Sequence, residues 1–270
     1  MKQRHDNERD HRINKQWLPT TKKEIDHLGW DHIDVIIFSG DAYIDHPSMG
    51  AAVIGRVLEA HGYNVAIVPQ PNWRDDLRDF KKLGRPRLFF GVSAGAMDSM
   101  VNHYTANRRR RSDDAYTPDG RAGQRPDCPT VVYSEILKRL WPDVPVVAGG
   151  IEASLRRLAH YDYWKDRLVP SILMESPADI MVYGMGEKPM LQIADALNDG
   201  MPIEALSTYL KRWFAVRSTR FPPMEAMWCF TLLRNVCATR KNKRRISVTS
   251  RLNQTCGTVT RCGKPLEMWQ

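Results

Sequence analysis

At 270 residues, the chain is long enough for one large or two small domains with a buried core. No stretch approaches the ~20 apolar residues that span a bilayer. The charged start MKQRHDNERDHRINKQ lacks the apolar segment of a signal peptide. These features exclude a membrane-spanning protein and predict a cytoplasmic one, with a disordered leader at residues 1–16.

The net charge of +9 suggests a nucleic-acid partner, but the charge is unevenly distributed. Residues 207–270 hold 13 of the 40 Lys and Arg residues and only 2 of the 31 Asp and Glu residues. The body of the chain is therefore close to neutral, and we expect nucleic acid to bind only through this basic tail.

Five short apolar segments alternate with helix-like segments in the body of the chain. The expected buried strands are residues 34–38, 64–68, 87–92, 144–150 and 178–184. This alternation predicts an α/β fold with a doubly wound, mainly parallel five-stranded sheet, which is flavodoxin-like or cobalamin-binding-domain-like. Among the expected helices, one spans 49–61 with Ser48 as its N-cap, and another begins at Asn72 and stops at Gly84.

Loops of small residues follow four of these strands, at the edge where sheets of this kind bind ligands. Glycine lets a ligand approach the backbone, and helix N-termini favour anions; glycines needed only for packing are the alternative. Four such loops together predict a pocket for an unknown small-molecule substrate, with Asp41 and Glu152 as polar anchors. The residues expected at the pocket are Ser39, Gly40, Asp41, Tyr43, Asp45, His46, Ser93, Ala94, Gly95, Gly149, Gly150, Glu152, Ser154, Gly184, Gly186 and Glu187.

One of these loops, GVSAG (91–95), also matches the G-x-S-x-G motif of serine hydrolases. Ser93 would be the nucleophile and would need a histidine base further along the chain. His103 is expected on the following helix, where it would point away from the end of the strand that carries Ser93. His160 is the other later histidine, and its availability is the one reason to consider it as the base. A serine hydrolase at Ser93 is therefore the alternative function.

Two further motifs carry less weight. GMGEKPM resembles a dinucleotide-binding fingerprint, but Pro189 stands in place of its third glycine, and the motif follows the last strand rather than the first. The RRRR run at 108–111 has the chemistry to bind phosphate. Asp113 and Asp114 follow it almost directly, which favours a solvated loop.

Several long strings resemble the N-terminal region of the YgiQ family of radical-SAM proteins, from about residue 17 to about residue 206. They are LGWDHIDVIIFSGDAYIDHPSMGAAVIGRVLEAHGYNVAIVPQP, LFFGVSAGAMDSMVNHYTANRR, DDAYTPDG, VPVVAGGIEASLRRLAHYDYW and ADIMVYGMGEKPM. The resemblance implies a multi-domain bacterial enzyme with a partial barrel after this region. In that barrel a C-x-x-x-C-x-x-C loop would hold a 4Fe–4S cluster, and the cluster would bind S-adenosylmethionine.

The strings VPVVAGG and VYGMGE also resemble loops of the cobalamin-type domains that precede radical-SAM barrels. In one class of cobalamin-binding domains, the loop after the first strand carries D-x-H-x-x-G, and its histidine binds cobalt. This chain has Ile44 in place of that aspartate and Met49 in place of that glycine. Cobalt binding is therefore not transferred to His46, which we expect in an extended conformation before Pro47, at the mouth of the pocket.

The chain departs from the family pattern in its cysteines and in its tail. Cys128 is the one cysteine before residue 207, and the later cysteines, separated by 7, 18 and 5 residues, do not form C-x-x-x-C-x-x-C. No cofactor is therefore expected on this chain, and we do not expect it to cleave S-adenosylmethionine alone. We interpret residues 17–206 as a substrate-binding accessory domain of a radical-SAM enzyme.

The tail at 207–270 shows no sustained period of 2 or 3.6 residues. We interpret it as a possible out-of-frame segment, which would make the chain an N-terminal fragment. A genuine basic tail that binds nucleic acid is the alternative.

Overall fold

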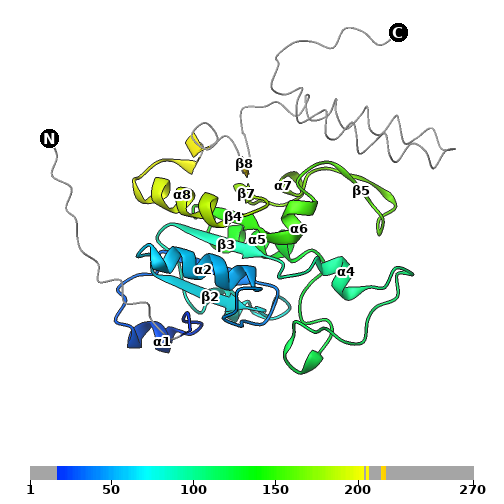
Figure 1. Ribbon diagram of the computed structural model, residues 1–270, viewed down its shortest axis with the longest axis horizontal. Coiled ribbons are helices and arrows are strands. Elements are labelled where there is room, and N and C mark those ends of the chain that lie inside the picture. Colours follow the sequence, from blue (N-terminus) through cyan, green and yellow to red (C-terminus); the bar gives the residue numbers. More distant parts are fainter. Residues whose placement is uncertain (1–16, 204, 207–213, 217–270) are drawn as a thin grey trace, which may run out of the picture. The chain divides into compact units, whose positions relative to one another are not determined.

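The computed structural model describes residues 17–203, 205–206 and 214–216 (Figure 1). The predicted leader and nearly all of the predicted tail lie outside these residues. Two units are distinguished: residues 1–157 with 172–217, and residues 158–171 with 218–270. No helix in the described part of the chain has the length and apolar character needed to cross a membrane.

The first unit contains a six-stranded sheet in the order β2-β1-β3-β4-β7-β8. Its strands are β1 (Val35–Ser39), β2 (Val65–Pro69), β3 (Phe89–Ser93), β4 (Val146–Gly149), β7 (Ile180–Val182) and β8 (Phe214–Val216). The first five are parallel, and β8 pairs antiparallel with β7. The predicted doubly wound, mainly parallel sheet is confirmed, and β8 adds a short edge strand from the segment predicted as tail.

Helices cover both faces of this sheet. The helices described in the first unit are α1 (Lys22–His27), α2 (Gly50–Ala60), α3 (Arg78–Lys81), α4 (Ser99–His103), α5 (Pro129–Leu140), α6 (Gly150–Leu155), α7 (Ile172–Glu175) and α8 (Glu187–Asn198), and a 3₁₀ turn, η1, spans Pro118–Gly120. The second unit contributes an antiparallel hairpin of β5 (His160–Asp162) and β6 (Arg167–Val169).

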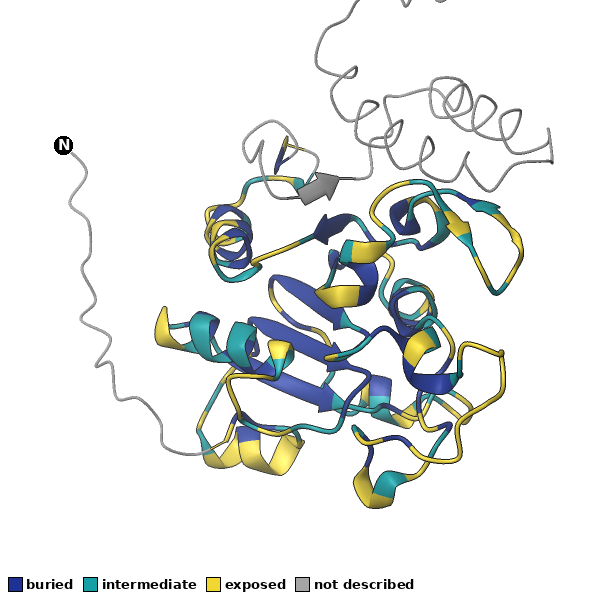
Figure 2. Ribbon diagram, turned by 45° about the vertical axis from the view of Figure 1, so that its right-hand side comes forward, coloured by how far each residue is buried: buried dark blue, intermediate teal, exposed yellow. Residues whose placement is uncertain are grey.

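The central strands are apolar on both sides because each face of the sheet packs against helices (Figure 2). Ile36 and Phe38 point to the core that contains Tyr133 of α5. Ile37 points to the opposite core, which contains Leu58 of α2 and residues of α8. Successive side chains of one strand thus fill two different cores, and α2 and α8 lie together on one face.

The predicted helix from Asn72 to Gly84 is wrong in extent, since only α3 is helical there. The side chain of Asn72 accepts a hydrogen bond from the N–H of Arg74 (3.1 Å), and that of Asp75 accepts one from Leu77 (2.9 Å). These local bonds hold the backbone in turns and compete with a helix.

The predicted N-cap of α2 is also wrong. Met49 is the N-cap and makes no side-chain capping bond. The Ser48 hydroxyl is hydrogen-bonded instead to Nδ1 of His46 (2.7 Å). The strand-to-helix turn is therefore held by a bond between two side chains of the loop itself.

Candidate ligand-binding site

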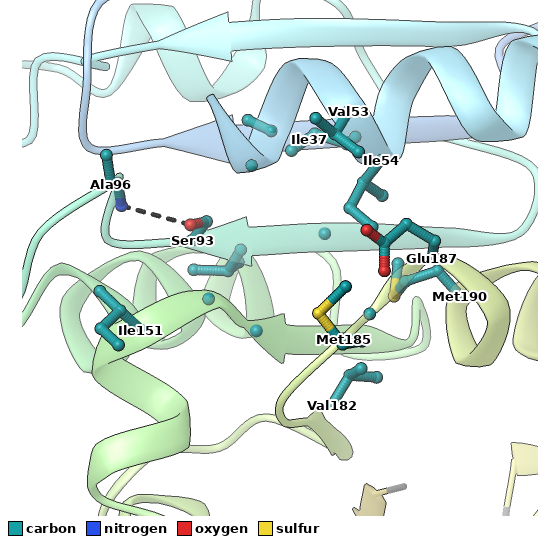
Figure 3. Close-up of a pocket in the computed structure, with 18 of the residues that line it drawn as sticks. Ile37, Val53, Ile54, Ser93, Ala96, Ile151, Val182, Met185, Glu187 and Met190 are labelled. Atoms are coloured by element: carbon teal, nitrogen blue, oxygen red, sulfur yellow. Dashed lines mark hydrogen bonds between the residues drawn. The ribbon is translucent and has the colours of Figure 1, made fainter. Parts of the chain in front are cut away.

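A cavity of about 340 Å³ opens at the carboxyl edge of the sheet, on the face that α2 and α8 cover (Figure 3). Its apolar side chains come mainly from three strands and two helices: Ile37, Val147 and Val182 of β1, β4 and β7, and Val53, Ile54 and Met190 of α2 and α8. The volume and the apolar lining are those of a small-molecule pocket. Its place matches the edge at which doubly wound sheets bind ligands.

The absence of a side chain at Gly91 helps to create this space. Gly91 lies in the middle of β3, between Phe90 and Val92, and lines the cavity. The three atoms nearest to a Cβ atom built on Gly91 all belong to Ile37, and the nearest of them lies at 3.4 Å, an ordinary van der Waals distance. We did not predict Gly91, although a glycine inside a buried strand is a signal for close approach of another group.

Three of the four predicted loops bring predicted residues to the mouth of the cavity. These are Ser93, Gly95, Gly149, Gly150, Gly184, Gly186 and Glu187. The loop after β1 instead contributes Pro47 and Ser48, which were not on the predicted list. Glu187, in the first turn of α8, supplies the one carboxylate of the lining and forms no ion pair with any other described residue.

Asp41, predicted as an anchor for a ligand, is only 2 % exposed and points into the protein. Its Oδ1 lies 2.7 Å from Nη1 of Arg125, and its Oδ2 accepts a hydrogen bond from the N–H of Ala96 (2.6 Å). Arg125 is fully buried and also donates to Asp114 (3.0 Å) and to the carbonyl oxygen of Ala94 (3.0 Å). Asp41 therefore belongs to a buried ionic cluster of Asp41, Arg125 and Asp114.

The two carboxylates of this cluster differ in their electrostatics. Burial raises the pKa of Asp41, and the Ala96 N–H and the charge of Arg125 offset this only in part. Burial also acts to raise the pKa of Asp114, but the hydrogen bond from Tyr116 N–H and the charge of Arg125 outweigh it, and that pKa is lowered. Asp114 is thus the carboxylate that favours its charged form.

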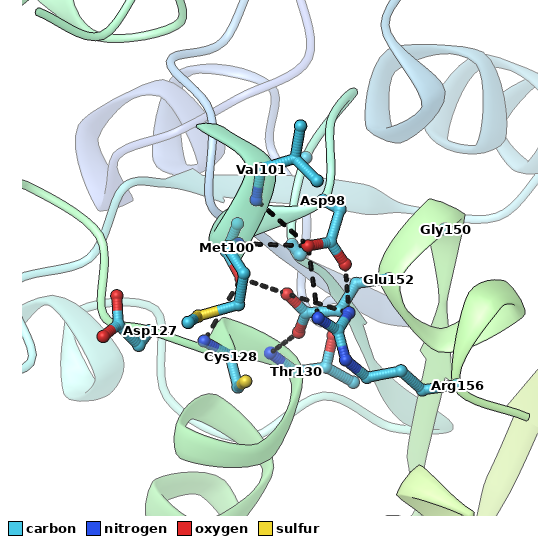
Figure 4. A network of polar contacts seen from close by, with 12 residues as sticks. Asp98, Met100, Val101, Asp127, Cys128, Thr130, Gly150, Glu152 and Arg156 are labelled. Atoms are coloured by element: carbon cyan, nitrogen blue, oxygen red, sulfur yellow. Dashed lines mark hydrogen bonds and ion pairs between the residues drawn. The ribbon is translucent and has the colours of Figure 1, made fainter. Parts of the chain in front are cut away.

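Glu152, the other predicted anchor, has no exposed surface and is likewise held by the protein (Figure 4). It accepts hydrogen bonds from the Ser99 hydroxyl and from the N–H of Thr130 (3.1 Å). Arg156 lies 4.0 Å from Glu152 and forms an ion pair with Asp98. Glu152 therefore ties α6 to the beginnings of α4 and α5.

Close packing within the protein explains other predicted residues. A Cβ atom on Gly40 would overlap the carbonyl oxygen of Ala94. The Ser39 hydroxyl accepts a hydrogen bond from the N–H of Asp41 (3.2 Å). For Gly40, the structure thus supports the packing alternative over close approach of a ligand.

The rest of the loop after β1 faces away from the cavity lining. Asp45 pairs with Arg56 of α2 (3.0 Å between Oδ2 and Nε). His46 is exposed and bonded to Ser48. Neither Asp45 nor His46 lines the cavity, and only their neighbours in the loop reach it.

Tyr43 and Ser154 also have partners inside the protein. The Tyr43 hydroxyl accepts a hydrogen bond from the N–H of Leu18 (3.1 Å). The Ser154 hydroxyl donates to the carbonyl oxygen of Gly150 (2.7 Å), one turn earlier in the chain. The same hydroxyl accepts a hydrogen bond from the N–H of Gly184 (3.3 Å), and Ser154 is not part of the cavity lining.

The structure does not assemble a catalytic triad around Ser93. Its hydroxyl accepts a hydrogen bond from the N–H of Gly95 (3.2 Å). His103 is buried, and its Nδ1 is bonded to Asp127 (2.7 Å). His160 belongs to β5 in the other unit. Among the described residues, Ser93 has no hydrogen bond to a histidine, so nothing in this geometry favours hydrolysis.

The described residues do not fit an iron–sulfur cluster. They contain no group of three or more His, Cys, Asp or Glu residues that could hold a metal ion. A 4Fe–4S cluster needs several thiolates, and Cys128 is the one cysteine of residues 17–206.

The sheet order and the pocket define a flavodoxin-like α/β domain with a small-molecule cavity at the carboxyl edge of its sheet. The family model described as Radical SAM N-terminal matches residues 17–255, so the chain belongs to this family. The resemblance seen in the sequence is thereby confirmed.

Curated relatives share this part of their sequence at high identity. The chain is 67 % identical over 206 residues to a UPF0313 protein of Porphyromonas gingivalis, covering 76 % of this chain and 32 % of the relative. It is 69 % identical over 191 residues to one of Bacteroides thetaiotaomicron, covering 71 % and 31 %. It is 52 % identical over 214 residues to the UPF0313 protein YgiQ of Escherichia coli, covering 76 % and 29 %. The chain thus spans about a third of the length of these relatives.

Proposed function

We propose that residues 17–206 are the substrate-binding accessory domain of a cytoplasmic radical-SAM enzyme of the YgiQ type. The cavity at the carboxyl edge of the sheet carries this proposal, because it lies in a chain of the radical SAM N-terminal family. The cluster and S-adenosylmethionine would be held by the part of the relatives that lies beyond the match. No step of that chemistry is assigned to the residues described here.

The lining indicates the kind of molecule that would fit. Most of it is apolar, with serine hydroxyls near the mouth and Glu187 as the charged group. Glu187 forms no ion pair in the described part of the chain, so its carboxylate is available to a donor on the ligand. We infer a small molecule with an apolar body and a cationic or hydrogen-bond-donating group.

Filling the cavity is expected to abolish ligand binding. In the Gly91→Val variant, two methyl groups would occupy space beside Ile37 that is now part of the cavity. The full chain is incubated with a small-molecule extract of bacterial cells, and bound molecules are measured by native mass spectrometry. We expect a molecule bound 1:1 to the unaltered chain and at least tenfold lower occupancy in Gly91→Val.

Ala60→Val, at the exposed end of α2, is the control and should bind as the unaltered chain does. Thermal denaturation shows that each variant is folded. Equal occupancy in Gly91→Val and the unaltered chain, or no bound molecule on any of them, would contradict a substrate-binding cavity.

The assignment to a radical-SAM enzyme predicts a difference between this chain and its longer relatives. Treated with iron, sulfide, a strong reductant and S-adenosylmethionine, the E. coli YgiQ protein is expected to form 5′-deoxyadenosine. This chain should form none above a protein-free blank, because it lacks the closely spaced thiolates that hold the cluster. The amount of 5′-deoxyadenosine formed by each protein is measured by chromatography. The assignment would be refuted if the E. coli protein formed none, or if this chain formed it above the blank.

A further inference from the structure

The arginine run at 108–111 is held on an ordered hairpin that follows α4. Antiparallel pairing joins Tyr104 to Arg110. The N–H of Thr105 donates to the carbonyl oxygen of Arg109 (2.8 Å), and the N–H of Arg111 donates to that of His103 (2.8 Å). The four consecutive arginines, all exposed, therefore lie on a backbone of defined shape rather than on an irregular loop.

The base of this hairpin is anchored in the protein. His103 is 6 % exposed, and its Nδ1 is bonded to one oxygen of Asp127 (2.7 Å). The hydroxyl of Tyr104 donates to the other oxygen of Asp127 (2.9 Å). Because the base is fixed, less conformational entropy is lost when a partner binds the arginines.

The acidic residues expected to neutralise the run do so only in part. Asp114 is 2 % exposed and pairs with buried Arg125, so its charge is directed inward. That leaves Asp113 as the exposed acid directly after the run. Among the described residues, no acid lies within ion-pair distance of Arg109, Arg110 or Arg111, although the charge of Arg110 acts at longer range on Asp127 at the base of the hairpin.

We propose that the hairpin of Arg108–Arg111 binds the phosphodiester backbone of a nucleic acid. Guanidinium groups match phosphate oxygens in a two-pronged geometry, and a row of them along an exposed turn suits a chain of regularly spaced phosphates. Such contacts are independent of base sequence and weaken with salt, because counterions are released on binding. The inference does not depend on the substrate cavity.

The test compares two triple variants of the full chain that lose the same charge. One is Arg109→Ser, Arg110→Ser and Arg111→Ser. The other is Lys22→Ser, Lys23→Ser and Arg78→Ser, which removes exposed cations of α1 and α3. Fluorescence anisotropy measures binding to a labelled 20-nucleotide single-stranded RNA and to duplex DNA of the same sequence, from 50 to 200 mM KCl. Basic residues 207–270 are the same in both variants.

We expect the hairpin variant to lose about tenfold or more in affinity at 100 mM KCl, and the control less than twofold. Each lost phosphate contact lowers the salt slope by about 0.7 on single strands, so the slope should fall by about 2. If the hairpin variant loses affinity for only one of the two nucleic acids, that nucleic acid is the partner of the hairpin. Equal loss in both variants, or no loss in the hairpin variant on either nucleic acid, overturns the proposal.

Discussion

Replacing Arg125 with methionine is expected to lower the free energy of unfolding by about 3–5 kcal/mol. Methionine has similar length but leaves Asp41 and Asp114 buried without their shared cation. It also removes the donor to the carbonyl oxygen of Ala94. Urea denaturation at pH 7 measures the loss.

The same variant should depend on pH in a defined direction. Without the charge and hydrogen bonds of Arg125, the folded-state pKa of both Asp41 and Asp114 should be higher than in the unaltered chain, because burial acts to raise both. A carboxyl group with a raised folded-state pKa loses its stabilising contribution as pH rises through that pKa. The difference from the unaltered chain should therefore shrink between pH 7 and pH 4, where the carboxyl groups become protonated.

Arg121→Met is the matched control, because that side chain is 71 % exposed and pairs with Asp119, which is also exposed. Its effect should stay within about 0.5 kcal/mol. If Arg125→Met were as mild as Arg121→Met, or if its cost grew on acidification, the ionic cluster would not stabilise the fold as described.

Replacing Gly40 with alanine is expected to destabilise the protein by about 3 kcal/mol, at the upper end of the usual cost of overpacking. The added methyl group would overlap the carbonyl oxygen of Ala94. This atom belongs to the backbone directly after β3, so it cannot move aside as a flexible side chain would. The loops after β1 and β3 would have to separate.

Gly50→Ala provides a control with the same change of side chain. Gly50 begins α2, and nothing lies within 4 Å of a Cβ atom built there. Because alanine favours helix over glycine by about 1 kcal/mol, this variant should be neutral or more stable. Thermal and urea denaturation compare the two, and equal stability would show that the contact between the two loops is not tight.

These contrasts separate two roles of the small residues at the carboxyl edge of the sheet. Gly40 allows two loops to pack against each other, whereas Gly91 leaves part of the cavity empty. The sequence does not distinguish the two, because Gly40 follows one buried strand and Gly91 lies within another. Their surroundings in the fold distinguish packing from pocket formation.

The doubly wound sheet and the edge at which the cavity lies could both be predicted from the order of apolar and small residues along the chain. A parallel strand covered by helices on both faces must be apolar throughout, so β1 and β3 stand out as short runs of Val, Ile and Phe. The glycine-rich ends of β3, β4 and β7 then follow at one edge. Among the residues predicted there, Ser93, Gly149 and Glu187 line the cavity.

Which charged residues face that cavity depends on contacts between segments that are far apart in the chain. Asp41 and Asp114 turn inward because Arg125, distant from Asp41 in the chain, is buried between them. Glu152 turns inward because Ser99 and Thr130 supply its donors. A carboxylate in a loop points towards the cations and N–H groups that fold around it, and local sequence does not specify those partners.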